Sequence, residues 1–159
     1  LNMILGDNTV LSNFALVGEL QLLEAYCGDR GATTSYVFRE FERGVKEGFF
    51  SNNELEWLRR LNFEGDKERQ LFDNLSKRLG VGEASCLAIA MHREYGFLSD
   101  DMAVRKIALR EGIRLSGSVG VLLELIRGGS ISLEQGNEIL KGFIRFGYFS
   151  PLDRLDGVL

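Results

Sequence analysis

Five acidic residues lie where their carboxylates could act together. They are Asp7, Glu40, Glu83, Asp100 and Asp101. Two unit charges about 4 Å apart repel each other by roughly 4 kcal/mol at an effective dielectric constant near 20, so a carboxylate cluster calls for a compensating cation. Oxygen ligands without His or Cys suit Mg²⁺ or Mn²⁺ better than Zn²⁺. Such a site can hydrolyse a substrate with a metal-activated water.

Each acid also has a purely structural explanation. Asp7 and Asp100 each close a short apolar run, and Asp is a good cap for a following helix. Glu40 and Glu83 are expected in first helical turns, where the helix dipole favours acids by a few tenths to about 1 kcal/mol. The functional interpretation depends on their conjunction, since ligand crevices in open α/β sheets lie at the carboxyl ends of the strands.

Short apolar runs alternate with amphipathic segments along the chain, and this pattern predicts the elements that position the acids. Strands are expected at 3–7, 32–37, 96–100 and 112–115. Helices are expected at 11–27, 38–46, 66–79, 83–95, 102–111, 119–127 and 133–146. The segment 48–65 suits either a short helix or a strand. The alternation implies right-handed crossovers and a mostly parallel sheet.

Length and composition indicate one ordinary folded domain. The chain has 159 residues, of which 45% are hydrophobic and 26% charged, which excludes disordered, collagen-like and coiled-coil proteins. A formal net charge of -4 argues against a protein that coats nucleic acid through its overall field. Cys27 and Cys86 are expected to be packing residues. The first apolar run is too short for a signal peptide or membrane span, so we expect a cytoplasmic protein.

Five short segments, taken in order, resemble the PIN-domain superfamily. They are 7–11 (DNTVL), 37–40 (VFRE), 82–84 (GEA), 98–105 (LSDDMAVR) and 116–122 (SGSVGVL). Within this superfamily the chain is similar to the DUF3368 group of predicted nucleic-acid-binding proteins, which are relatives of VapC-type toxins. The resemblance extends over nearly the whole chain, and the ordered set of segments carries it.

The resemblance implies a three-layer α/β/α fold with a mostly parallel sheet of four or five strands. It implies one PIN-like domain at residues 3–150, followed by a C-terminal tail at 151–159. The implied activity is that of a ribonuclease (an endonuclease) that uses Mg²⁺ or Mn²⁺, and the toxin of a toxin-antitoxin pair is one form that it takes.

The resemblance also assigns roles to the acids. Asp7 and Glu83 match metal ligands, and Glu40 matches a further catalytic acid. The last ligand is either Asp100, which its strand-end position favours, or Asp101, which its spacing to 108–112 favours. We therefore retain both as catalytic and metal-binding candidates. Thr9 matches the small hydroxyl residue that supports Asp7.

Basic residues near the acids are candidates for holding RNA phosphates. Arg39, Arg43 and Lys46 belong to the expected helix of Glu40, and Arg105, Lys106 and Arg110 to the helix after Asp100. We take Thr9, Arg39, Arg43 and Arg105 as the substrate-binding set. Their structural alternative is a solvated helix face or, for Arg105, an ion pair with Asp101. The aromatic residues of segment 48–65 form no convincing stacking platform.

Other phosphate-processing folds fit less well. A haloacid-dehalogenase-type phosphatase needs an Asp where Thr9 stands, and a receiver domain needs adjacent acids near its first strand. His92 is the single histidine and is expected to be a partly exposed structural residue, which disfavours a His-dependent ribonuclease. The remaining alternative is a PIN-like module that binds RNA or protein without cleaving. The apolar C-terminal helix suits core closure and contact with a small antitoxin or, in a dimer, a second copy.

Overall fold

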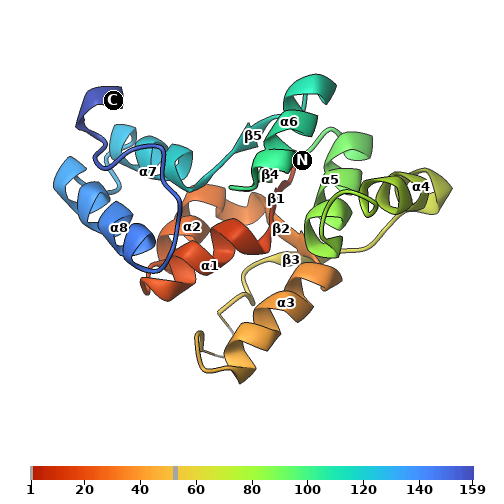
Figure 1. Cartoon of the computed structure of the whole chain (residues 1–159), viewed down its shortest axis with the longest axis horizontal. Coiled ribbons are helices and arrows are strands. Elements are labelled where there is room, and N and C mark those ends of the chain that lie inside the picture. Colours follow the sequence, from red (N-terminus) through yellow and green to blue (C-terminus); the bar gives the residue numbers. More distant parts are fainter. Residues whose placement is uncertain (1, 52–53) are drawn as a thin grey trace.

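Five parallel strands form the central sheet of the computed structural model, which describes residues 2–51 and 54–159 (Figure 1). The strands are β1 (Ile4–Gly6), β2 (Gly31–Thr34), β3 (Arg59–Leu61), β4 (Gly96–Leu98) and β5 (Leu115–Ser116). Their order across the sheet is β3-β2-β1-β4-β5, and every neighbouring pair is parallel. All five strands therefore end at the same edge of the sheet.

Helices cover both faces of this sheet. They are α1 (Asn8–Leu16), α2 (Leu20–Cys27), α3 (Ser35–Lys46), α4 (Gly65–Leu75), α5 (Val81–Arg93), α6 (Met102–Glu111), α7 (Ser118–Arg127) and α8 (Leu133–Arg145). Helices α1, α2, α7 and α8 lie on one side of the sheet in Figure 1, and α4 and α5 lie on the other. The predicted three-layer α/β/α fold with a five-stranded parallel sheet is confirmed. Within the described residues, no helix combines the length and apolar character that crossing a membrane requires.

Helix α5 is the central helix of its layer. Every side chain from 84 to 90 is completely buried, and the helix contacts β1, β2 and β4 as well as α3 and α4. This agrees with the sequence, where apolar residues occupy most of its circumference. Cys86 of α5 and Cys27 of α2 are both buried and free, as expected of packing residues. Helix α5 is therefore fixed against the sheet along its length.

The first predicted helix is wrong in one respect. The expected single helix at 11–27 is divided into α1 and α2, because the chain turns at Gly18, whose φ of 72° lies in the left-handed region that favours glycine. The predicted strand at 112–115 is also too early. Gly112 adopts φ 68° and ends α6, and only Leu115 and Ser116 pair with β4.

Helix α3 begins earlier than the β-rich sequence 32–37 predicts. The Thr34 hydroxyl accepts a hydrogen bond from the Val37 N–H (3.4 Å), which caps α3 and ends β2. Glu40 therefore lies in the second turn of α3, and the prediction that it starts a helix is wrong. In the segment 48–65, which the sequence leaves ambiguous, β3 forms an exposed edge strand.

The segment 151–159, expected to be a tail, packs back against α8. Leu155 is completely buried, and its N–H donates to Asn137 Oδ1 (2.7 Å). Asn137 Nδ2 in turn donates to Asp156 Oδ1 (3.1 Å). A buried Leu held by a buried Asn makes this segment part of the packed structure.

Candidate active site

The acids gather at the carboxyl edge of the sheet, around the ends of β1 and β4. Asp7 directly follows β1, and its N–H donates to Leu98 O at the end of β4 (3.1 Å). Asp100 and Asp101 follow two and three residues after Leu98. Because β1 and β4 are parallel neighbours, acids that are more than ninety residues apart in sequence lie at the same edge of the sheet.

Asp7 is a completely buried carboxylate with one oxygen in use and one free. Its Oδ1 accepts hydrogen bonds from the Thr9 N–H (2.9 Å), the Thr9 hydroxyl (2.5 Å) and the Val10 N–H (3.4 Å), and thereby caps α1. Its Oδ2 is buried and has no partner among the described residues. Burial raises the pKa of Asp7 to about 7, although these donors oppose the shift. Because an unpaired buried oxygen is costly, Asp7 Oδ2 is expected to bind a cation or a proton.

Glu83 is, with Asp7, a strongly perturbed acid of the group. It lies in the first turn of α5, and its Oε2 is buried without a partner among the described residues. Burial and the carboxylates of Asp101, Asp7 and Glu40, which face it, raise its pKa to about 8. The negative charges of the other three acids therefore all disfavour the ionised form of Glu83.

The side chain of Glu40, on α3, extends toward this group past Gly82 of α5, which has no side chain. A Cβ at Gly82 would overlap Glu40 Oε1, so a larger residue there would force this carboxylate to move away. Burial raises the pKa of Glu40, while Arg43 and the Gly82 N–H partly offset the shift. The motif 82–84 thus supplies both an acid and the space that admits a second one.

The structure separates the two neighbouring aspartates. Asp100 accepts hydrogen bonds from the Ser118 N–H (2.8 Å), the Ser118 hydroxyl (2.5 Å) and Asn13 Nδ2 (3.0 Å), so both of its oxygens are occupied. Asp101 caps α6 through Oδ1, which accepts from the Ala103 and Val104 N–H groups, and its carboxylate faces Glu83. Asp101 therefore joins the acid group, whereas Asp100 ties β4 to α1 and α7.

Two hydroxyls hold this arrangement together. The Thr9 hydroxyl donates to Asp7 Oδ1 and accepts the Asp100 N–H (2.9 Å), so it bridges the two strand ends. The Ser99 hydroxyl is buried and accepts the Asp101 N–H (3.2 Å). It also lies beside Asp7, and of the neighbouring donors it does most to oppose the rise in the pKa of that carboxyl. Both hydroxyls are used within the protein, which makes them positioning groups.

The candidate phosphate-binding arginines lie at different places around the acids. Arg39 lies over the ring of Tyr36, and Arg43 is close enough to Glu40 to lower its pKa. Arg105 acts in the same way on Asp100, and the described ion pairs do not join it to Asp101. Arg43 therefore borders the acid group on the α3 side, Arg39 lies on the same helix over Tyr36, and Arg105 of α6 lies near Asp100.

The acid group has the chemistry of a site for a hard divalent cation. It offers only carboxylate oxygens, and two of these, on Asp7 and Glu83, are buried without partners among the described residues. In the described structure, however, no three Asp, Glu, His or Cys side chains are arranged to hold one ion. The residues therefore fit Mg²⁺ or Mn²⁺ in kind and number, and their side chains must close together to coordinate it.

Several residues that build the site carry no signal in the sequence alone. Asn13 and Ser118, which saturate Asp100, come from α1 and α7 and meet only in the folded chain. Thr34 and Ser85, both buried, share a hydrogen bond of 2.7 Å between β2 and α5. Ser118 and Ser99 do fall within segments of the family resemblance, which is the one signal that points to them.

Comparison with known proteins identifies one family. The sequence model of a family described as a PIN domain, DUF3368, matches residues 3–159. No curated protein and no solved structure matches the chain.

Proposed function

Since the chain belongs to the PIN-domain family DUF3368, whose fold is of the nuclease type, we propose that it is a Mg²⁺- or Mn²⁺-dependent endoribonuclease. The single observation that carries this proposal is Glu83. A half-buried carboxyl with a pKa of about 8 that faces three further carboxylates is typical of a metal-binding catalytic site. The family and the residues thus support the same chemistry from independent directions.

The proposed cation ligands are Asp7, Glu83 and Asp101. When bound, the cation activates a water and stabilises charge on the phosphate and the leaving oxygen. In its absence Glu83 holds a proton near neutral pH, and cation binding displaces that proton. Thr9 keeps Asp7 Oδ1 engaged at the α1 N-terminus and leaves Oδ2 as the free oxygen. The contacts of Asp100 support a positioning role for it in this scheme.

The RNA backbone requires cations beside this acidic group. We assign Arg39 and Arg43 to this role on the α3 side and Arg105 on the α6 side. Arg43 lies near Glu40 and Arg105 near Asp100, Arg39 lies on the same helix as Arg43, and the described ion pairs include none of the three. These arginines offset the negative charge that would otherwise repel the substrate.

The test is cleavage of a mixed RNA pool with Mn²⁺ or Mg²⁺, with EDTA, and with two variants. Glu83→Gln keeps the shape of the side chain and removes its charge. Glu138→Gln is the matched control, because Glu138 is an exposed residue of α8 that pairs only with Lys141. The proposal predicts cleavage by the parent and the control, no cleavage with EDTA, and cleavage by Glu83→Gln that is slower by about a hundredfold or more. Equal degradation with and without EDTA would contradict it, and so would full activity of Glu83→Gln.

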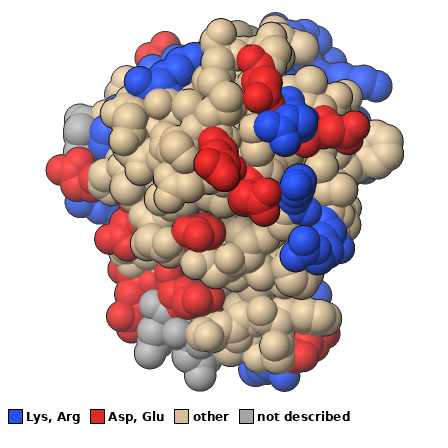
Figure 2. Space-filling view, turned by 90° about the vertical axis from the view of Figure 1, so that its left-hand side faces the viewer, with Lys and Arg blue, Asp and Glu red and all other residues tan. Residues whose placement is uncertain are grey.

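A protein partner is proposed at the C-terminal end of α8. Phe146 and Phe149 are exposed there by 53% and 96%, and large exposed apolar side chains mark contact surfaces. Figure 2 shows the face of the molecule that lies at the left in Figure 1, where acidic and basic side chains are interspersed among neutral ones. In a toxin-antitoxin pair, the partner would be a small antitoxin that restrains cleavage of cytoplasmic RNA. A second copy of the chain is the simplest partner, and light scattering at increasing concentration, with Phe149→Ser as the variant, detects it.

A further inference from the structure

A pocket of about 330 Å³ opens at the carboxyl ends of β2 and β3, beside the acid group. Its walls include Tyr36 and Arg39 from α3, Asn62 and Phe63 after β3, and Arg69 from α4. It lies at the same edge of the sheet as the acids, since all strands are parallel. None of these residues has a role in holding the acids described above.

Aromatic rings form one side of this pocket. The ring centroid of Tyr36 lies 5.0 Å from that of Phe72 and 6.2 Å from that of Phe63, and Phe63 and Phe72 are 5.0 Å apart. All three side chains are partly exposed, so the cluster is fixed by its own packing and still presents ring surface. The sequence alone does not predict this cluster, because its members come from α3, the loop after β3 and α4.

Two free cations accompany the rings. The Arg39 guanidinium lies 5.0 Å from the centroid of Tyr36, as in a cation–π contact. Arg69 also lines the pocket. Both side chains are exposed, and the ion pairs of the described residues include neither. They are therefore available to an anionic ligand.

The pocket is mechanically joined to the acid group. Thr34 caps α3 just before Tyr36, and its hydroxyl is bonded to Ser85 Oγ, two residues after Glu83 on α5. Arg39 directly precedes Glu40 on α3. A ligand in the pocket would thus be held at a fixed position relative to Glu83.

We propose that this pocket binds one base of single-stranded RNA beside the cleavage site. The base stacks on the exposed ring surface of Tyr36 and Phe63, and Arg39 and Arg69 contact the flanking phosphates. Aromatic rings with arginines are the common means of holding single-stranded nucleic acid, because every base has a π face. The identity of the ligand rests on the proposed ribonuclease function, whereas the pocket itself does not.

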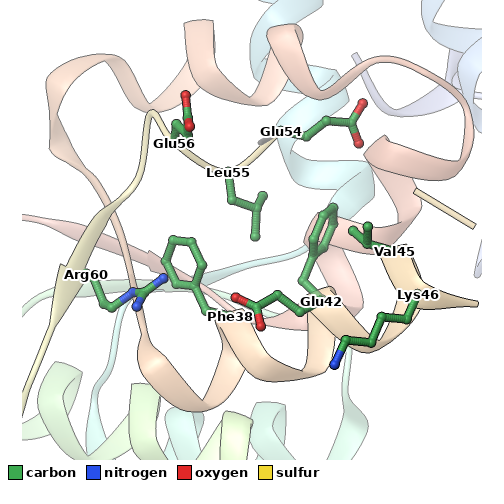
Figure 3. A pocket seen from close by; sticks show the side chains of 9 residues that line it. Phe38, Glu42, Val45, Lys46, Glu54, Leu55, Glu56 and Arg60 are labelled. Atoms are coloured by element: carbon green, nitrogen blue, oxygen red, sulfur yellow. The ribbon is translucent and has the colours of Figure 1, made fainter. Parts of the chain in front are cut away.

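A second pocket, of about 410 Å³, is a poorer match for RNA (Figure 3). Phe38 and Leu55 point into it, but three acids line it as well: Glu42, Glu54 and Glu56. Their charge repels phosphates. Arg60 lies over Phe38 at 3.9 Å, which makes this a second arginine–aromatic pair at a different site. Arg60 therefore serves as a matched control.

Binding is measured by fluorescence anisotropy with a short labelled oligouridine in EDTA, so that cleavage plays no part. Loss of one base-stacking contact predicts that Tyr36→Leu weakens binding about tenfold or more, while Tyr36→Trp retains it. Arg69→Gln is expected to weaken binding and to reduce the salt slope by about one. Arg60→Gln should change the affinity by less than about twofold, since it removes an equivalent pair outside the proposed site. Circular dichroism checks that each variant is folded.

Direct contact is tested with a single tryptophan in the pocket. The variant that combines Trp57→Phe with Tyr36→Trp places the only tryptophan there. Stacking of a base should quench its fluorescence when oligouridine is added in EDTA. Unchanged fluorescence, together with full binding by Tyr36→Leu, would overturn the inference even if the parent protein cleaves RNA. Quenching without any metal-dependent cleavage would support the pocket and overturn the proposed function instead.

Discussion

Helix α5 has a charged cluster at each end. The pKa of the central carboxyl is lowered in one cluster and raised in the other. At its C-terminal end, Glu68 of α4 is completely buried, with His92 Nδ1 at 2.6 Å and Arg93 Nε at 2.8 Å, and it accepts the Glu64 N–H at 2.8 Å. Burial disfavours its charge, but these donors hold the pKa of Glu68 at about 2. At the N-terminal end, Glu83 Oε2 has no described donor, and burial with facing acids raises its pKa to about 8.

The comparison contrasts a carboxylate that stabilises the fold with carboxylates whose role we propose to be metal binding. A buried acid that stabilises the fold is surrounded by donors from its own chain, as Glu68 is. An acid group that lacks such donors, as at Asp7 and Glu83, holds its charge at a cost and takes up a proton at a higher pH than usual, or a cation where one binds. The same contrast separates Asp100 from Asp101 within the site.

The largest expected effect is at the structural end. Glu68→Gln removes the charge that Arg93 and His92 need, and we expect a loss of about 3 kcal/mol in the free energy of unfolding, since breaking a buried ion pair from one side is costly. Glu83→Gln should leave the stability of the metal-free protein unchanged or increase it. Urea denaturation in EDTA measures both. Equal losses in the two variants would break the comparison.

The next effect is on cleavage. Glu83→Gln and Asp101→Asn are expected to lower the rate constant about a hundredfold or more, corresponding to roughly 2.7 kcal/mol of lost transition-state stabilisation. Asp101→Asn keeps a residue that caps α6 well. Glu68→Gln, at a temperature where it is folded, should cleave at a rate close to that of the parent. Initial rates on a defined RNA with saturating Mn²⁺ give these values, and a fully active Asp101→Asn would remove it from the ligand set.

Because the pKa values of Asp7 and Glu83 are raised in the folded protein, its stability should decrease as the pH rises. In EDTA, the folded protein keeps protons on Asp7 and Glu83 that the unfolded chain has already released, so the stability falls as pH rises from about 4 to about 8. We expect a loss of about 1–3 kcal/mol over that window after discounting for partial exposure of Glu83. Thermal melts across the window test this. The variant with Asp7→Asn and Glu83→Gln should show a flatter profile, and an equally steep one would assign the slope to other groups.

The smallest expected effect distinguishes the contributions of His92 and Arg93 to the Glu68 cluster. His92 contributes one hydrogen bond to Glu68, and its side chain is 39% exposed, whereas the Arg93 side chain is 12% exposed. His92→Gln is therefore expected to cost less than about 1 kcal/mol, a typical net value for one hydrogen bond. Arg93→Gln should cost clearly more. A reversed order in urea denaturation would mean that His92 is the main partner of Glu68.

Much of the fold is predictable from the sequence because it depends on local patterns. The alternation of short apolar runs with amphipathic segments predicts the parallel sheet, and the range of α6 agrees with the structure residue for residue. The errors have local causes too. β-Branched residues around Thr34 favour a strand, but the capping hydroxyl of that residue starts a helix instead. The exposed edge strand β3 has three residues and no buried face, so it has no alternation of apolar and polar residues from which it could be predicted.

The site is less predictable, because its energetics depend on contacts between distant segments. Strand-end position alone does not distinguish Asp100 from Asp101, since the difference comes from Ser118 and Asn13 on other helices. Glu68 lies in a charged helix that the sequence presents as solvated, and its partners follow 24 and 25 residues later. His92 was expected to be structural and partly exposed, and the structure agrees.

Calorimetric titration with MnCl₂ at about pH 7.5 tests most directly whether Asp7 and Glu83 await a cation, because binding must displace the protons they hold. The account predicts binding by the parent, with proton release that depends on the buffer, and no binding by the variant with Asp7→Asn and Glu83→Gln. Glu138→Gln should bind like the parent. If the parent shows no heat of binding, or if the double variant binds Mn²⁺ equally well, the acids at the carboxyl edge of the sheet are not a metal site.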